Sequence, residues 1–221
     1  IGYGNIGSQV SVLAEALGMK VLFYDAETKL PLGNASDSKS LKELLQLSDI
    51  VTLHVPELDS TRNLINKNNI RYFKHGAMLI NYARGEVVDL NALRKALLSG
   101  DIGGAAIDVF PVEPEKNGDI FSTVLQGLPN VLLTPHIGGS TQEAQNNIGL
   151  DVSVKLFNYL EKGTSTGSHS IPALALPPQE GAHRILHIHN NVPGILAKIN
   201  RVLAENEINI AGQYLKTNEQ I

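Results

Sequence analysis

The sequence predicts an α/β protein with a doubly wound parallel sheet, followed by a linker and the start of a smaller α+β domain. Two observations favour this fold class. A glycine-rich turn at Gly2, Gly4 and Gly7 opens a helical pattern, and short apolar runs then alternate with helical patterns over the first 163 residues. Strands that alternate with helices in this way pair in parallel and carry helices on both faces of the sheet.

The opening segment, IGYGNIGSQV, fits the pattern G-x-G-x-x-G. In a Rossmann-type dinucleotide site, the first glycine permits a tight turn, the second lets the backbone approach the pyrophosphate, and the third lets helix and strand pack closely. Residues 8–19 fit the following helix, and residues 20–25 fit the next strand, which ends at Asp25. An acid at this spacing accepts hydrogen bonds from the ribose of NAD and repels the extra phosphate of NADP. The segment therefore predicts NAD as cofactor, with a glycine turn of no function as the alternative.

The other elements follow from periodicity and from helix end signals. The first helix ends at Gly18 and has an apolar stripe on one face, formed by Val10, Leu13, Ala14 and Leu17. A polar loop follows Asp25. Helices are expected at residues 40–47, 66–73, 90–100, 140–163 and 192–207, and strands at 49–55, 76–82, 103–110, 129–135, 183–190 and 208–217. Asp89 and Gly100 are placed to cap and to end the helix at 90–100. The uninterrupted apolar run at 49–55 predicts a strand buried on both faces.

Composition narrows the classes of partner. The 221 residues are 43% hydrophobic and 18% charged, with a net charge of −4, which argues against a nucleic-acid partner. The chain has no cysteine, which excludes disulfides and fits a cytoplasmic protein. No apolar run is long enough for a membrane span, and we predict neither a membrane partner nor a metal site.

The chain is expected to have three parts. Residues 1–163 form the dinucleotide-binding domain, and residues 164–182, rich in Ser, Thr, Gly and Pro, form a linker. Residues 183–221 have a β-α-β pattern, which is too little for a complete domain.

Three charged residues follow three successive predicted strands: Arg84 in NYARG, Glu113 in DVFPVEP and His136 in TPHIGGS. Open α/β sheets bind ligands beyond the carboxyl ends of their strands. A hydride-transfer enzyme for hydroxy acids needs an Arg to hold a carboxylate, a His to exchange the hydroxyl proton and an acid to orient that His. The alternative for each residue alone is a surface ion pair or a loop histidine.

These motifs, together with GYGNIGSQV, resemble the NAD-dependent D-isomer-specific 2-hydroxyacid dehydrogenases. The resemblance implies that Arg84, Glu113 and His136 are catalytic. It also implies cofactor contacts from the glycine turn, from two acids and from the segments after two strands: Gly2, Gly4, Asn5, Ile6, Gly7, Asp25, Tyr82, Ala83, Arg84, Asp108, His136, Ile137, Gly138 and Gly139.

The tail, HRILHIHNNVPGILAKINRVLAENEINIAGQYL, resembles family members with a C-terminal regulatory domain of the ACT type, which has a ferredoxin-like fold. That resemblance implies oxidation of 3-phospho-D-glycerate to 3-phosphohydroxypyruvate, the first step of L-serine synthesis. It further implies L-serine as effector, bound by His189, Asn191 and Asn209, and a homo-oligomer, a tetramer by family resemblance. In this family the cofactor domain is inserted into a substrate-binding lobe, so the sequence looks like a fragment.

Three other functions stay open on the sequence alone. One is a different dehydrogenase of the same family, of the glyoxylate or hydroxypyruvate reductase type. Another is a non-catalytic module that binds NAD as a sensor, since such proteins keep the catalytic residues. The third is a serine-binding regulatory module with a vestigial enzyme domain. The ACT-like tail argues against the first two.

Overall fold

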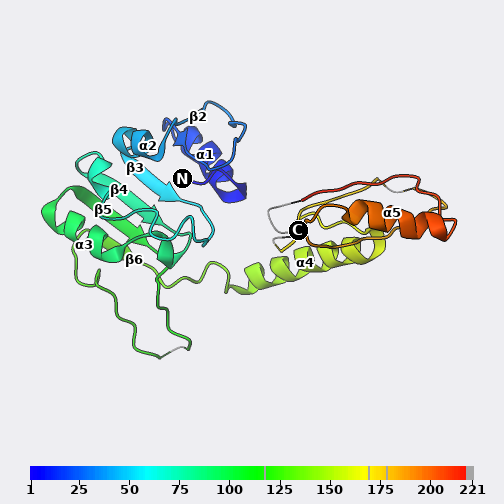
Figure 1. Ribbon diagram of the computed structural model, residues 1–221. Coiled ribbons are helices and arrows are strands. Elements are labelled where there is room, and N and C mark those ends of the chain that lie inside the picture. The colour runs from blue at the N-terminus through cyan, green and yellow to red at the C-terminus, as the bar shows by residue number, and fades with distance from the viewer. Residues whose placement is uncertain (117, 169, 178, 218–221) are drawn as a thin grey trace. The chain divides into compact units, whose positions relative to one another are not determined.

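The computed structural model describes residues 1–116, 118–168, 170–177 and 179–217. The chain divides into two compact units, Ile1–His136 and Ile137–Ile221, and each is described by itself (Figure 1). Two positions of the expected linker, 169 and 178, and the last four residues of the expected regulatory segment lie outside the described residues. Among the helices of the described part, none is long and apolar enough to cross a membrane.

The first unit is built on parallel strands (Figure 1). Strands β3 (Ile50–Leu53), β4 (Ala77–Asn81), β5 (Ile102–Ile107) and β6 (Val131–Leu133) pair in that order. Strand β1 (Leu22–Phe23) pairs with β2 (Ser36–Asp37), and all these ladders are parallel. The parallel sheet predicted from the alternating pattern is therefore confirmed. Strand β2 lies in the stretch after Asp25 that was predicted to be a polar loop.

The first two residues join the two sets of strands. The Ile1 nitrogen donates a hydrogen bond to the carbonyl of Thr52, at 2.8 Å, and the Ile1 carbonyl accepts one from the His54 amide, also at 2.8 Å. On the other side, the Gly2 amide donates to the carbonyl of Tyr24 at 2.8 Å. The glycine turn thus starts between β1 and β3, in the middle of the sheet.

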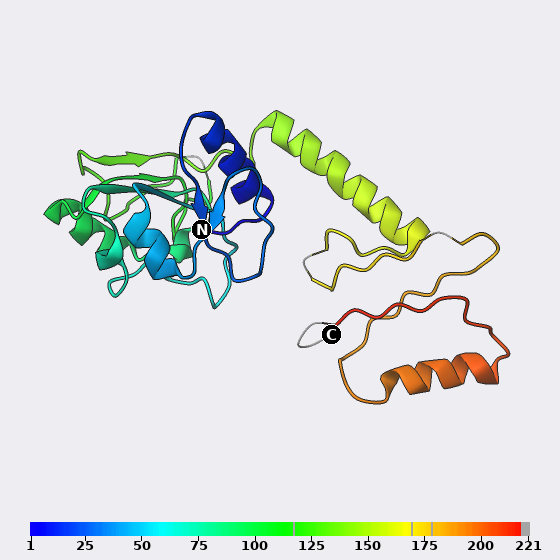
Figure 2. The same cartoon turned by 90° about the horizontal axis from the view of Figure 1, so that it is seen from above.

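Helices cover the two sides of this sheet unequally. Helix α2 (Leu41–Leu47) contacts the 3₁₀ turn η1 (Ile70–Tyr72), which in turn contacts helix α3 (Leu90–Ser99). Helix α3 packs on β5. Helix α1 (Asn5–Ala16) lies on the opposite side (Figure 2). The expected cap of α3 is confirmed, because the Asp89 carboxylate accepts hydrogen bonds from two first-turn amides and Gly100, with φ 81°, ends the helix.

The main core lies between β3–β5 and the helices α2 and α3. Its fully buried members include Leu45, Leu53, Leu79, Leu93, Ile102 and Ile107. The other face of the strands is open, and Ile50 and Met78 are 43% and 52% exposed there. The expectation that strand 49–55 is buried on both faces is wrong for this structure, because burial alternates along β3: Val51 and Leu53 are buried, whereas Ile50 is exposed.

Helix α1 faces the sheet with small residues. Gly7 and Ser11 are its buried residues, whereas Leu17, from the predicted apolar stripe, is 77% exposed. A Cβ on Gly7 would lie 2.0 Å from the Gly2 carbonyl oxygen. The close approach of α1 to the Gly2 backbone therefore selects the face with Gly7, and Leu13 and Leu17 of the stripe are left exposed.

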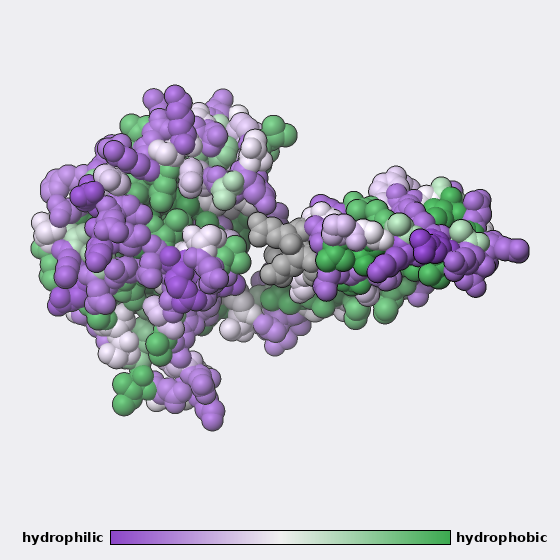
Figure 3. All heavy atoms as spheres, viewed as in Figure 1, coloured by the Kyte–Doolittle hydropathy of each residue, from purple (hydrophilic) through white to green (hydrophobic). Residues whose placement is uncertain are grey.

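The second unit contains helices α4 (Gln142–Lys162) and α5 (Ile195–Glu205), both predicted, and no residue of either helix is buried. Hydrophobic residues reach the surface of this unit (Figure 3). The strands expected at 183–190 and 208–217 are wrong for this structure, in which neither described segment belongs to a strand. A strand forms only with a neighbour that exchanges hydrogen bonds with it, and no described segment is paired with either of these two.

Candidate active site

The three predicted charged residues follow neighbouring strands. Arg84 comes three residues after the end of β4, and Glu113 and His136 follow β5 and β6. Because these strands are parallel and adjacent, their carboxyl ends meet at one edge of the sheet. This is the edge at which open α/β sheets bind ligands.

His136 and Glu113 form the central contact of this edge. The Nδ1 atom of His136 lies 2.8 Å from Oε2 and 3.1 Å from Oε1 of Glu113. The Phe110 amide donates to Glu113 Oε1 at 2.9 Å and so fixes the carboxylate. With Nδ1 bonded to an acid, Nε2 is the ring nitrogen left to exchange a proton with a ligand. The His136 side chain is 41% exposed, which leaves it accessible to a substrate.

The turn that carries Arg84 is held by a buried side chain. Asn81, at the end of β4, is 0% exposed. Its Oδ1 accepts a hydrogen bond from the Ala83 amide at 3.1 Å, and its Nδ2 donates to the Arg84 carbonyl at 2.9 Å. Asn81 was not predicted from the sequence; the available signal was an amide side chain at the end of an otherwise apolar strand.

Gly85 brings two loops together. A Cβ at this position would lie 2.1 Å from the carbonyl carbon of Phe110. The turn after Arg84 therefore lies directly against the backbone that leads to Glu113. Gly85 was not predicted from the sequence either, since the contact joins segments that are 25 residues apart.

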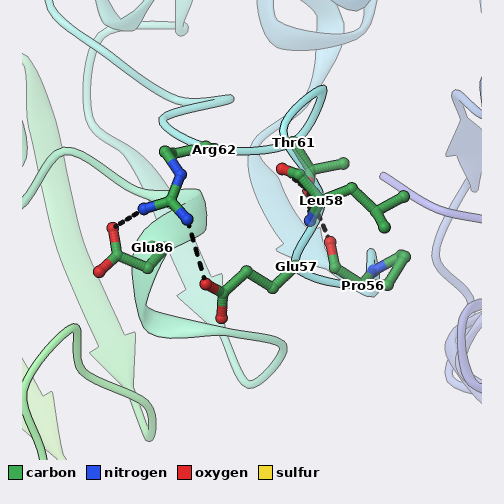
Figure 4. Close-up of polar contacts among 6 residues, drawn as sticks. All are labelled: Pro56, Glu57, Leu58, Thr61, Arg62 and Glu86. Atoms are coloured by element: carbon green, nitrogen blue, oxygen red, sulfur yellow. Dashed lines mark hydrogen bonds and ion pairs between the residues drawn. The ribbon is translucent and has the colours of Figure 1, made fainter.

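A second loop is tied to the same turn (Figure 4). The Arg62 guanidinium lies 3.5 Å from Glu57 Oε1 and 3.2 Å from Glu86 Oε2. The Asn63 amide also donates to the Glu86 carbonyl at 2.7 Å. These ion pairs are exposed and contribute little to stability. The backbone hydrogen bond from Asn63 is the main link between the loop after β3 and the turn that follows Arg84.

The glycine turn fits a pyrophosphate. Gly2 has φ 84°, and a Cβ there would lie 2.5 Å from the His54 carbonyl oxygen, so only glycine suits the turn. Around Gly4, a Cβ would meet no atom within 4 Å, which leaves open space in front of the helix. Among the described residues no side chain caps the first turn of α1, so its amides at Asn5 and Ile6 are left for an anion.

Asp25 lies beside this turn. Its Oδ2 accepts the Tyr3 amide at 2.7 Å and its Oδ1 accepts the Glu27 amide at 2.9 Å. Tyr3 is itself fixed, because its ring stacks on Phe23 with a centroid distance of 3.9 Å. The carboxylate is thus held at the end of β1, where a ribose attached to the pyrophosphate would lie.

The remaining predicted cofactor residues lie in both units. Asp108 follows β5, and its Oδ1 accepts the His136 amide at 3.0 Å. Tyr82 is exposed after β4. The segment Ile137–Gly139 begins the second unit, so its role toward the first unit stays a prediction.

The predicted effector residues flank helix α5. His189 and Asn191 precede it and Asn209 follows it. The Nδ1 atom of His189 lies 3.0 Å from the Asn190 carbonyl oxygen. Their role in binding an amino acid also stays a prediction.

Residues 1–138 match the family model described as D-isomer specific 2-hydroxyacid dehydrogenase, NAD binding domain. The chain belongs to the D-isomer-specific 2-hydroxyacid dehydrogenases. The predicted cofactor, NAD, is therefore confirmed for this domain. Residues 185–221 match the model described as AHAS small subunit-like ACT domain, which confirms the predicted domain type in the tail.

Known family members extend the comparison. The chain is 56% identical over all 221 residues to the D-3-phosphoglycerate dehydrogenase of Haemophilus influenzae and covers 54% of that protein. A D-lactate dehydrogenase from a Sporolactobacillus species has a similar structure, with TM-score 0.65 and 40% identity over 74% of this chain and 52% of that one. The NAD-complexed D-isomer specific 2-hydroxyacid dehydrogenase from Lactobacillus delbrueckii ssp. bulgaricus gives TM-score 0.64 and 33% identity, over 72% and 52%. The chain thus spans about half the length of these relatives.

Proposed function

We propose that this chain is part of an enzyme that oxidises 3-phospho-D-glycerate to 3-phosphohydroxypyruvate with NAD, in the cytoplasm. The observation that carries the proposal is the 56% identity to a D-3-phosphoglycerate dehydrogenase, which extends over the whole chain, tail included. The contact between His136 and Glu113 supports it, because it supplies the proton transfer that such an oxidation requires.

The roles of the residues follow from their chemistry. NAD supplies the acceptor for the hydride that leaves the carbinol carbon. The Nε2 atom of His136 accepts the hydroxyl proton, while Glu113 on Nδ1 fixes the ring and stabilises the imidazolium ion. The Arg84 guanidinium binds the substrate carboxylate with its planar pair of donors.

The activity is tested with the complete product of the gene. The measurement is NADH oxidation with 3-phosphohydroxypyruvate, compared with glyoxylate, hydroxypyruvate and pyruvate. We expect the highest kcat/KM for the phosphorylated substrate. A higher value for glyoxylate or hydroxypyruvate would make the protein a reductase of that type. Tight NADH binding without oxidation of any of these substrates would make it a non-catalytic NAD-binding module.

The acid–base role is tested with His136→Ala. Positioned acid–base catalysis contributes about 10²–10⁴-fold, so kcat should fall by about that factor. The matched control is His75→Ala, since His75 is exposed in the loop before β4. Near-normal turnover by His136→Ala would remove His136 from the mechanism.

The regulatory part of the proposal is that L-serine binds at His189, Asn191 and Asn209 of paired chains in a homo-oligomer, a tetramer. The match of the tail to an ACT domain supports it. Serine would inhibit through different affinities for two states of the enzyme.

A serine titration of the complete protein tests this site. Asn191→Ala and Asn209→Ala should each raise the serine concentration needed for inhibition and leave uninhibited turnover unchanged. Asn146→Ala, on an exposed turn of α4, is the control. Inhibition of both variants at the parent concentration would place the site elsewhere. Sedimentation of the parent tests the oligomeric state.

A further inference from the structure

Polar side chains after three successive strands contact one another. They are Tyr82 after β4, Asp108 after β5 and Thr134 after β6. The Thr134 hydroxyl donates a hydrogen bond to Asp108 Oδ1 at 2.6 Å, and the Tyr82 hydroxyl oxygen lies 3.4 Å from Thr134 Oγ1. Because Thr134 has a single hydroxyl hydrogen, its bond to the carboxylate leaves Oγ1 as the acceptor toward Tyr82.

The same carboxylate oxygen holds the backbone of His136. Asp108 Oδ1 also accepts the His136 amide, at 3.0 Å. His136 has φ 51°, in the left-handed region that residues other than glycine rarely adopt. A backbone held in this region depends on the contacts around it. The bond to Asp108 is such a contact, and it sets the direction in which the His136 ring leaves the chain.

Both partners of the Thr134–Asp108 bond are fixed by the sheet. The Asp108 amide donates to the Asn81 carbonyl at 3.1 Å, and the Thr134 amide donates to the Ile107 carbonyl at 3.0 Å. A hydroxyl–carboxylate bond of 2.6 Å is in the short, charge-assisted class. The carboxylate of Asp108 therefore has one orientation as long as the Thr134 hydroxyl is present. Neither bond uses Oδ2, which is left for the cofactor contact predicted for Asp108.

We propose that Thr134 is a positioning residue for His136 and for the cofactor, acting through Asp108. Its hydroxyl orients the Asp108 carboxylate, which then fixes the His136 backbone with Oδ1 and presents Oδ2 to the bound cofactor. The catalytic consequence rests on the proposed function; the consequences for cofactor binding and for the His136 amide do not.

The test compares Thr134→Val, which removes the hydroxyl, with Thr134→Ser, which keeps it, in the complete protein. Thr134→Val should lower kcat by about tenfold to a hundredfold, the effect of small misplacements at a reacting group, with little change in substrate KM. It should also raise the NADH dissociation constant and speed hydrogen exchange at the His136 amide. Thr134→Ser should keep the parent values of all three.

The chain offers a matched control. Thr123 has a buried hydroxyl with no hydrogen-bond partner among the described residues, so Thr123→Val makes the same change of side chain without breaking such a bond. It should leave kcat, NADH affinity and His136 exchange unchanged.

Each outcome decides the proposal. Parent-like values of kcat, NADH affinity and amide exchange in Thr134→Val would overturn it. Equal losses in Thr134→Val and Thr134→Ser would also overturn it, because the hydroxyl would not be the cause. A parent protein that reduces none of the 2-oxo acids would contradict the proposed function, and NADH affinity and His136 exchange would then decide the role of Thr134.

Discussion

Single residues that take no direct part in the proposed chemistry hold the candidate site in place. The fully buried Asn81 side chain forms hydrogen bonds with the backbone of Ala83 and Arg84 and so fixes the turn that carries Arg84. Buried amides with both ends bonded are costly to replace, because each lost partner leaves an unpaired polar group. The position of Arg84 therefore depends on a neutral residue three positions earlier in the chain.

His54 should make the stability of the protein depend on pH. Burial lowers the pKa of His54 from 6.5 to about 4. Because the folded-state pKa lies below the unfolded value, the unfolded chain binds a proton first. The free energy of unfolding should therefore fall as pH falls from about 6.5 to about 4.

Urea unfolding near neutral pH and near pH 5 measures this effect. His54→Asn should lose less stability between the two pH values than the parent does. His75→Asn, at an exposed histidine, should behave like the parent. Equal pH dependence in the parent and in His54→Asn would contradict the prediction.

Asp25 should decide between the two nicotinamide cofactors. Its carboxylate is fixed by two amides beside the glycine turn, where a 2′-phosphate would be repelled. Asp25→Ala should weaken NAD binding and narrow the discrimination against NADP, as measured by the two dissociation constants. Asp59→Ala, in an exposed loop, is the control. Equal affinity of the parent for both cofactors would show that Asp25 does not discriminate.

At the scale of elements, two close contacts depend on glycine residues. Gly7 lets α1 approach the Gly2 backbone in the turn that precedes it, and Gly85 lets the Arg84 turn lie on the backbone after β5. In both places the neighbour is backbone, which cannot move aside as a flexible side chain can. Larger residues are therefore excluded at these two crossings, whatever their polarity.

Gly85→Ala tests this close approach. The added methyl group would overlap Phe110, and overpacking of this kind costs about 1–3 kcal/mol of unfolding free energy. Turnover should also fall, since the loops of Arg84 and Glu113 are pushed apart. Gly149→Ala, in α4 with no atom within 4 Å of the added Cβ, should instead stabilise its helix by about 0.5–1 kcal/mol. Denaturant unfolding of both variants measures the difference, and an unchanged midpoint for Gly85→Ala would contradict the predicted overlap.

At the scale of the whole chain, the exposure of His136 predicts that the chain by itself can bind the cofactor without catalysing the reaction. His136 is 41% exposed in this chain, whereas hydride transfer requires a site from which water is excluded. We expect the 221-residue chain, purified by itself, to bind NADH but not to reduce 3-phosphohydroxypyruvate. Fluorescence titration and an NADH oxidation assay, run beside the complete gene product, measure the two properties. Turnover by the chain at the rate of the complete product would contradict this.

Local patterns in the sequence predicted much of the first unit. Glycine spacing predicted the turn before α1, and apolar runs predicted β3–β6, because both are set by neighbouring residues. Arg84, Glu113 and His136 could be proposed as site residues for the same reason, since each follows a recognisable strand. The cap at Asp89 and the helix end at Gly100 are likewise encoded within a single turn of α3.

Contacts between distant segments were decided only by the tertiary structure. The place of Ile1 and Gly2 between β1 and β3, and the contact of Gly85 with Phe110, join segments with no common local pattern. Close packing at Gly7 decided which face of α1 is buried, although the apolar stripe predicted a different face. The tail shows the same dependence, because a strand pattern at 183–190 becomes a strand only when another strand supplies its hydrogen bonds. Periodicity in the sequence indicates which residues can share a face of a helix or strand. Whether that face is buried depends on the segments that pack against it in the tertiary structure.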